Sequence, residues 1–189
     1  MTISEPWRVV VEAAQRRGLP LDEVLRAGAS PAKLGKAETK LGIQFHPDLR
    51  ELFQLANGMR RIRGHNNEPS LLGFSFPSLQ EAVRQTIDLR DAAEEYGTAG
   101  AWRASWLKVF DDIDNECFVV DCSDGSVWYV YWAADEIYRV APDLATFFGV
   151  VAIAAERDDV HYQLDGDYFE TPDGEVWEAP IKSPWRQTS

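Results

Sequence analysis

Hydrophobic and polar positions change their period several times between residues 106 and 148, which makes this region the most informative part of the chain. Short apolar or alternating runs, separated by polar turns, predict β-strands. We expect four in succession, at residues 106–110, 116–121, 127–132 and 136–140. The tripeptide Ser123-Asp124-Gly125 suits a hairpin turn. A helix is predicted directly afterwards, from residue 142 or 143 to about residue 157.

The third predicted strand is apolar on both sides, because side chains alternate across a strand. Its two faces carry Val127, Tyr129 and Tyr131 on one side and Trp128, Val130 and Trp132 on the other. Strands that are apolar on both faces are normally covered on both. Either the fold supplies two covering layers, or a partner supplies one of them.

The first half of the chain has helical periodicity. Helices are predicted at residues 7–17, 21–27, 31–41, 47–57 and 79–96. Ser30 suits the N-cap of the third helix, and Ser78 with Glu81 has the form of a capping box for the fifth. Residues 71–76 predict a short strand. In the tail, an Asp165-Gly166 turn predicts a small hairpin.

Length and composition predict one soluble, cytoplasmic protein. A chain of 189 residues can build a single domain around its own core. Its apolar runs are shorter than the roughly 18 to 20 residues of a spanning helix, and Glu5 and Pro6 stand where a signal peptide carries basic residues. Cys117 and Cys122 would face opposite sides of an extended segment, so we expect two reduced, buried thiols.

The negative charge is concentrated in the last part of the chain. The net charge is -12, and residues 111–189 contain four Lys/Arg against eighteen Asp/Glu. Such a field repels nucleic acids and anionic membranes and speeds the encounter with a basic protein. An acidic surface that only keeps the protein soluble is the alternative.

Motifs for catalysis or metal binding are missing from the sequence. His46, His65 and His161 fall in three different predicted elements, without the spacing of metal ligands. The alternation of Asp112, Asp114 and Glu116 lacks the glycine of a calcium loop. Since no phosphate-binding loop occurs either, we expect a non-catalytic binding protein with no cofactor and no metal. A hydrolase using a carboxylate pair stays open as an alternative.

The order of motifs resembles the SUKH superfamily, the Smi/Knr-type domain, across about residues 37–150. Leu41-Gly42, the segment 47–52 and Ala56-Asn57-Gly58 look like its opening helix, and residues 78–81 like its next helix start. The sheet and the last helix are matched by Trp106, Asp121, Gly125-Ser126-Val127 and the segment 141–147.

This resemblance implies an α+β fold in a single domain, with a mixed, mostly antiparallel sheet of about four to six strands packed by helices. Residues 37–150 would form the core domain. Residues 1–36 would add a helical extension, and residues 151–189 the end of the last helix and an acidic extension. Leu49, Phe53, Asn57 and Trp106 are assigned to the fold.

Many bacterial members of the superfamily are inferred to be immunity proteins, which implies a cognate toxin with a basic surface, such as a nuclease, as the partner. An intracellular regulatory or scaffold module with an endogenous partner is the alternative. We expect the partner to be bound by carboxylates and neighbouring aromatic side chains. The candidates are Asp111, Asp112, Asp114, Glu116, Trp128, Tyr131, Trp132, Asp158, Asp159, Asp165 and Asp167.

Overall fold

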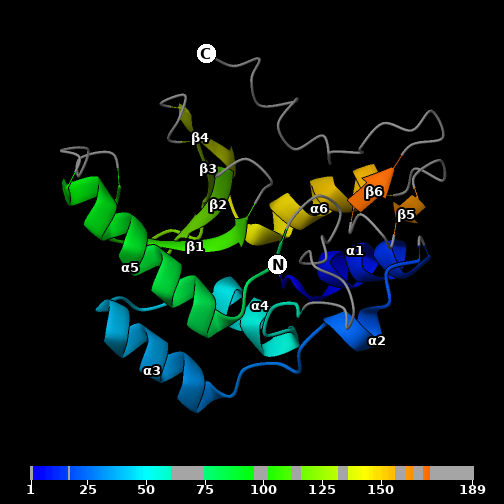
Figure 1. Cartoon of the computed structure of the whole chain (residues 1–189), viewed down its shortest axis with the longest axis horizontal. Coiled ribbons are helices and arrows are strands. Elements are labelled where there is room, and N and C mark those ends of the chain that lie inside the picture. Colours follow the sequence, from blue (N-terminus) through cyan, green and yellow to red (C-terminus); the bar gives the residue numbers. More distant parts are fainter. Residues whose placement is uncertain are drawn as a thin grey trace.

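The computed structural model describes residues 2–16, 18–60, 75–95, 102–111, 116–131, 136–155, 161–163 and 168–170. Helices dominate the first half of the chain and strands the second (Figure 1). The helices are α1 (Ser4–Arg16), α2 (Leu21–Val24), α3 (Pro31–Leu41), α4 (Pro47–Leu55), α5 (Leu79–Glu95) and α6 (Leu144–Ala155). The strands are β1 (Trp106–Asp111), β2 (Glu116–Asp121), β3 (Val127–Tyr131), β4 (Glu136–Ala141), β5 (His161–Gln163) and β6 (Tyr168–Glu170).

The main sheet is an antiparallel meander in the order β1-β2-β3-β4, and β5 pairs with β6 in a separate hairpin. This arrangement confirms the predicted α+β fold, with every pairing between described strands antiparallel. Phe118 of β2 lies opposite Tyr129 of β3, and Val119 lies opposite Trp128. The two faces of β3 are therefore divided as the alternation predicts.

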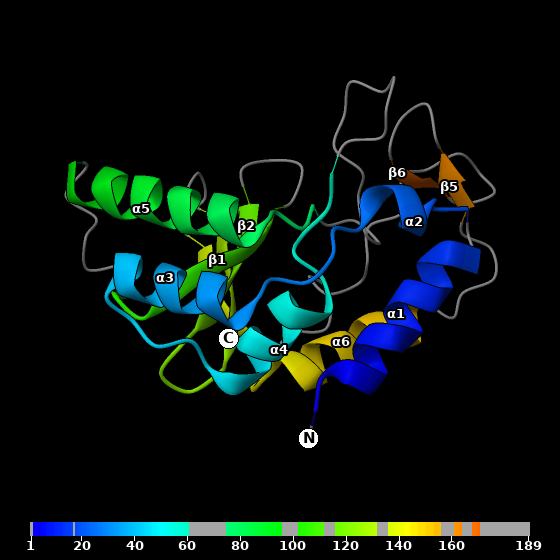
Figure 2. The same cartoon turned by 90° about the horizontal axis from the view of Figure 1, so that it is seen from below.

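One face of the sheet is covered by the main hydrophobic core. Phe110, Phe118 and Tyr129 are buried there, and Phe147 of α6 stacks on Phe110 with ring centroids 5.8 Å apart. Trp7 of α1 meets Phe148 of α6 edge to face at 5.2 Å. In both views α1 lies alongside α6 (Figures 1 and 2), so the N-terminal helix shares this core.

The opposite face is covered by a smaller cluster. Trp106, Val119 and Val130 are buried against Trp102 and Ala93, the latter from α5. Helix α5 also binds the edge of the sheet, because the Thr86 hydroxyl accepts a hydrogen bond from the Lys108 amide at 3.0 Å. Within the described residues, the chain itself covers both faces of β3.

Several predicted elements differ from the structure in their bounds: α1 begins at Ser4 rather than at residue 7, and α4 ends at Leu55 rather than at residue 57. The helix expected at 21–27 ends at Val24, because Leu25 pairs with Met59 and the Arg26 amide donates to the Gly58 carbonyl. Of the strand expected at 71–76, Ser75 forms an isolated bridge with Asp111, and residues 71–74 lie outside the described part. The last helix begins at Leu144 rather than at 142 or 143, since Asp143 accepts from the Thr146 amide as its cap.

In the described ranges, no helix combines the length and the hydropathy needed to cross a bilayer. The two cysteines are free thiols. Burial raises the pKa of Cys117 to about 12, so this thiol stays protonated and is a poor nucleophile. Cys117 is buried as expected, whereas Cys122 is only half-buried.

Candidate functional site

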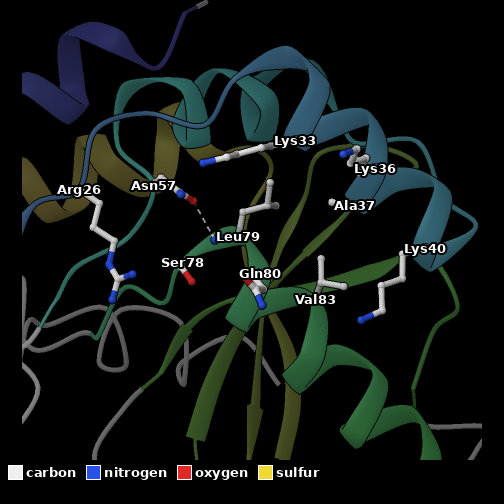
Figure 3. A pocket seen from close by; sticks show the side chains of 10 residues that line it. All are labelled: Arg26, Lys33, Lys36, Ala37, Lys40, Asn57, Ser78, Leu79, Gln80 and Val83. Carbon is white, nitrogen blue, oxygen red and sulfur yellow. Dashed lines mark hydrogen bonds between the residues drawn. The ribbon is translucent and has the colours of Figure 1, made fainter.

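A cleft of about 440 Å³ lies between α3 and the first turns of α5 (Figure 3). We call it the α3–α5 cleft. Its apolar part is formed by the buried side chains of Ala37, Leu79 and Val83. The cations that line it are exposed, and they are Arg26, Lys33, Lys36 and Lys40. The volume falls within the roughly 300 to 1,000 Å³ of small-molecule pockets.

The three lysines share one face of α3 because they are three and seven positions apart along a helix. Ala37 continues the same stripe, while Leu34 and Leu41 are buried on the neighbouring side. The helix begins at Pro31 after a Ser30 cap, whose hydroxyl accepts from the Lys33 amide at 3.4 Å. The Ser30 cap and Pro31 fix the start of the helix, so the lysines lie in one row along the cleft.

The start of α5 forms the opposite wall. The Asn57 side-chain oxygen accepts from the Leu79 amide at 2.9 Å, and the Ser78 hydroxyl accepts from the Glu81 amide at 3.3 Å. Among the described residues, the Gln80 amide has no acceptor. The Ser78 half of the predicted capping box is therefore formed, whereas the Glu81 carboxylate pairs with Arg84 instead.

Gly58 brings the end of α4 against the start of α5. Its φ is +77°, a left-handed conformation, and a Cβ atom there would lie 2.5 Å from the Pro77 carbonyl carbon and oxygen. A residue other than glycine would therefore separate the two segments. The Asn57-Gly58 pair thus positions Asn57 to cap α5 beside the cleft.

Arg26 is fixed at one end of the cleft by the backbone and by its own side chain. Its amide donates to the Gly58 carbonyl at 3.0 Å, and its carbonyl accepts from the Asn57 amide at 3.2 Å. The guanidinium Nε donates to the Met59 carbonyl at 3.0 Å. The charge of Arg26 is therefore held in place before any ligand binds.

In the part of the chain that the structure describes, no neighbouring carboxylate neutralises the cations of the cleft. Across the described ranges, Arg26 and the three lysines form no ion pair with a carboxylate. Glu38 of α3 binds Arg50 instead and accepts from the Phe45 amide. Burial opposes ionisation of Glu38, but these hydrogen bonds outweigh it and lower its pKa. A positive cleft thus stands in a chain of net charge -12.

Three of the sequence-predicted residues meet at one end of the sheet. Asp111 lies opposite Cys117 in the β1–β2 register, and Glu116 lies opposite Tyr131 in the β2–β3 register. The Asp111 carboxylate pairs with Lys108, and its backbone bridges to Ser75. Tyr131 is half-buried and packs against the main core.

Trp128 lies on the other face of β3, away from Tyr131. It is half-buried, its ring is 5.7 Å from that of Trp106, and the Arg103 guanidinium covers it at 4.1 Å. Its Nε1 donates to the Ser126 hydroxyl at 2.8 Å. The remaining candidates lie outside the described residues, and they are Asp112, Asp114, Trp132, Asp158, Asp159, Asp165 and Asp167.

Trp106 and Asp121, two residues that carry the resemblance to the SUKH superfamily, form a buried hydrogen bond. Trp106 Nε1 donates to the Asp121 carboxylate at 3.2 Å, while the Ser123 hydroxyl and amide donate to its other oxygen at 2.6 and 3.0 Å. Burial raises the pKa of Asp121, but the hydrogen bonds outweigh this and lower it below its ordinary 3.8. Through these hydrogen bonds, Asp121 links the β2–β3 turn to Trp106 of β1.

The α3–α5 cleft was missed by the sequence reasoning. A signal was present, because Lys33, Lys36 and Lys40 have the spacing of one helical face. Their meeting with α5 depends on tertiary packing, which no local pattern contains. No group of side chains suited to a metal ion occurs among the described residues.

Comparison with protein families identifies a family whose profile matches most of the chain. The profile of the SMI1/KNR4 family (SUKH-1) matches residues 28–149, which is more than half of the chain. The match confirms the resemblance found in the sequence and starts earlier than the expected residue 37. Curated proteins give no match to this chain.

Proposed function

The chain belongs to the SMI1/KNR4 family (SUKH-1), which includes immunity proteins, and from this we propose that it neutralises a toxin by stoichiometric binding. The match over residues 28–149 is the observation that carries the proposal. The protein binds the toxin and blocks its active site or the access of its substrate. No catalytic step by this chain is needed for such inhibition.

The charge supports a toxin with a basic surface, such as a nuclease. Residues 111–189 carry four Lys/Arg against eighteen Asp/Glu. Carboxylates can occupy the phosphate-binding site of a nuclease and pair with its cations, and close pairs of this kind contribute about 1.5 to 7 kcal/mol each. Long-range attraction between opposite charges also speeds the encounter.

We assign toxin binding to the end of the sheet that contains the β1–β2 connection. The acidic edge is defined as Asp111, Asp112, Asp114 and Glu116, with Tyr131 opposite Glu116 in the register. Trp128 and Trp132 are further aromatic candidates. Asp158, Asp159, Asp165 and Asp167 of the tail complete the proposed acidic surface.

Co-expression with the toxin encoded by an adjacent gene tests the function. We expect the protein to protect cells, to co-purify with the toxin, and to bind it more weakly as salt rises, because exposed charges are screened. A toxin that is neither bound nor neutralised contradicts the proposal and favours a module with an endogenous partner. Binding that is independent of salt contradicts the acidic surface but leaves immunity intact.

A triple variant, Asp112→Lys, Asp114→Lys and Glu116→Lys, tests the acidic edge. We expect it to abolish protection, since three attractive pairs become repulsive. Asp91→Lys, Glu94→Lys and Glu95→Lys change the same charge on exposed positions of α5 and form the matched control. Full protection by the first variant would remove the acidic edge from the binding surface.

A further inference from the structure

We propose that the α3–α5 cleft is a second docking site, which binds a short acidic segment of the toxin. Carboxylates of that segment contact Lys33, Lys36 and Arg26, while an apolar side chain of the same segment lies on Leu79 and Val83. The inference rests on the proposed function, because it takes the bound acidic segment to be part of the toxin that the protein neutralises. The protein would then contact the toxin through the basic α3–α5 cleft as well as through the proposed acidic surface.

The arrangement of charges in the cleft is unfavourable without an anion. Lys33 and Lys36 are three positions apart on α3, and Lys36 and Lys40 are four apart, so like charges face each other. Lys33 also lies in the first turn of α3, where the helix dipole favours acidic residues and the sequence provides none. A bound carboxylate pair would relieve this repulsion.

Two further groups, one at the start of α5 and one between α2 and α3, favour an anion at the same place. Gln80 lines the cleft, and its backbone N–H has no acceptor in the described part of the chain. It lies in the first turn of α5, where the helix dipole is positive. Arg26 adds a charge already held by the Met59 carbonyl, so little side-chain freedom is lost on binding.

The lining of the cleft favours a peptide over a bare anion or a nucleic acid. Leu79 and Val83 are buried side chains that, with Ala37, form the apolar floor of the cleft between the cations. A phosphate ion would leave this surface unused. A nucleic acid would extend its charges over the remaining surface of a chain of net charge -12. A short segment with adjacent acidic and apolar side chains fits both the cations and the apolar lining of the cleft.

A double variant, Lys33→Glu and Lys36→Glu, tests the site in the full-length protein. We expect about a tenfold or greater loss of affinity for the toxin. Arg16→Glu and Arg139→Glu make the same charge change at exposed positions outside the cleft and should change affinity less than about twofold. Lys33→Gln and Lys36→Gln form a milder pair, in case charge reversal impairs folding.

A peptide titration by NMR separates this inference from the function. The probe is acetyl-Leu-Glu-Glu-Leu-amide, and its glutamine analogue, inorganic phosphate and a single-stranded oligonucleotide are the controls. We expect the acidic peptide alone to shift the amides of Lys33, Leu79 and Gln80. Toxin binding that is unaffected by the lysine variants overturns the docking site and leaves immunity standing. A wild-type protein that binds the peptide but no toxin refutes the function, while binding of phosphate or oligonucleotide without peptide overturns the inference.

Discussion

The Asn57 side-chain oxygen accepts a hydrogen bond from the Leu79 amide at 2.9 Å, across 22 positions of the chain. This bond joins the second residue after α4 to the first residue of α5, which forms one wall of the α3–α5 cleft. Asn57 and Gly58 belong to the motif by which the chain resembles its family, so a fold determinant also shapes the candidate site.

Replacing Asn57 with alanine should lower the free energy of unfolding by about 1 kcal/mol, as the loss of a helix cap does. Asn57→Asp keeps an acceptor for the Leu79 amide and adds a charge that the helix N-terminus favours. Urea denaturation of both variants measures the difference. Equal destabilisation by alanine and aspartate would show that the hydrogen bond does not stabilise α5.

Gly58→Ala should destabilise the protein more than Gly42→Ala. Both glycines have positive φ values, +77° and +70°, which alanine adopts at a cost of about 1 to 2 kcal/mol. A Cβ at position 58 also meets the Pro77 carbonyl group, whereas one at position 42 meets nothing within 4 Å. The difference between the urea midpoints of the two variants measures the effect of the close approach between Gly58 and the Pro77 carbonyl group. Equal midpoints would show that this approach does not affect stability.

Lys36→Gln should stabilise the unliganded protein by about 0.5 kcal/mol at low salt, because it removes repulsion with Lys33 and Lys40. The gain should disappear in 1 M salt, where the Debye length falls to about 3 Å. Thermal or urea unfolding at both ionic strengths measures it. A variant that is less stable than the wild type at low salt would refute electrostatic strain in the cleft.

Stability should fall in acid partly through Asp121. Its pKa is lower in the folded protein than its ordinary 3.8, so its ionised form contributes stability above that value. That contribution is lost as the pH falls through 3.8 toward the folded pKa. Asp121→Asn should lower the free energy of unfolding by about 1 to 3 kcal/mol at pH 7.

The difference between wild type and Asp121→Asn should then narrow below pH 4, because protonation removes the same charge from the wild type. Asparagine keeps the shape of the side chain but retains a single oxygen, so the variant removes the charge and one of the two acceptors used by Trp106 and Ser123. Urea unfolding between pH 3 and pH 7 measures the curve. A difference that stays constant over this range would exclude a contribution from the ionised carboxylate.

The sequence predicted most of the sheet because its signal is local. Alternation assigns Tyr129 and Trp128 to opposite faces, and the structure buries Tyr129 in one core and half-buries Trp128 in the other. Helix 21–27 was predicted too long because its end depends on Leu25 pairing with Met59, far along the chain. The α3–α5 cleft escaped notice for the same reason, since its two walls are joined by tertiary contacts.

Titration of the toxin's activity with the purified protein tests stoichiometric neutralisation most directly. The toxin is held at a concentration well above the dissociation constant, and its activity is measured after each addition. We expect activity to fall linearly and to end at a fixed molar ratio, with the same ratio in the isolated complex. Loss of activity at far lower ratios, or full activity in excess protein, would contradict neutralisation by binding.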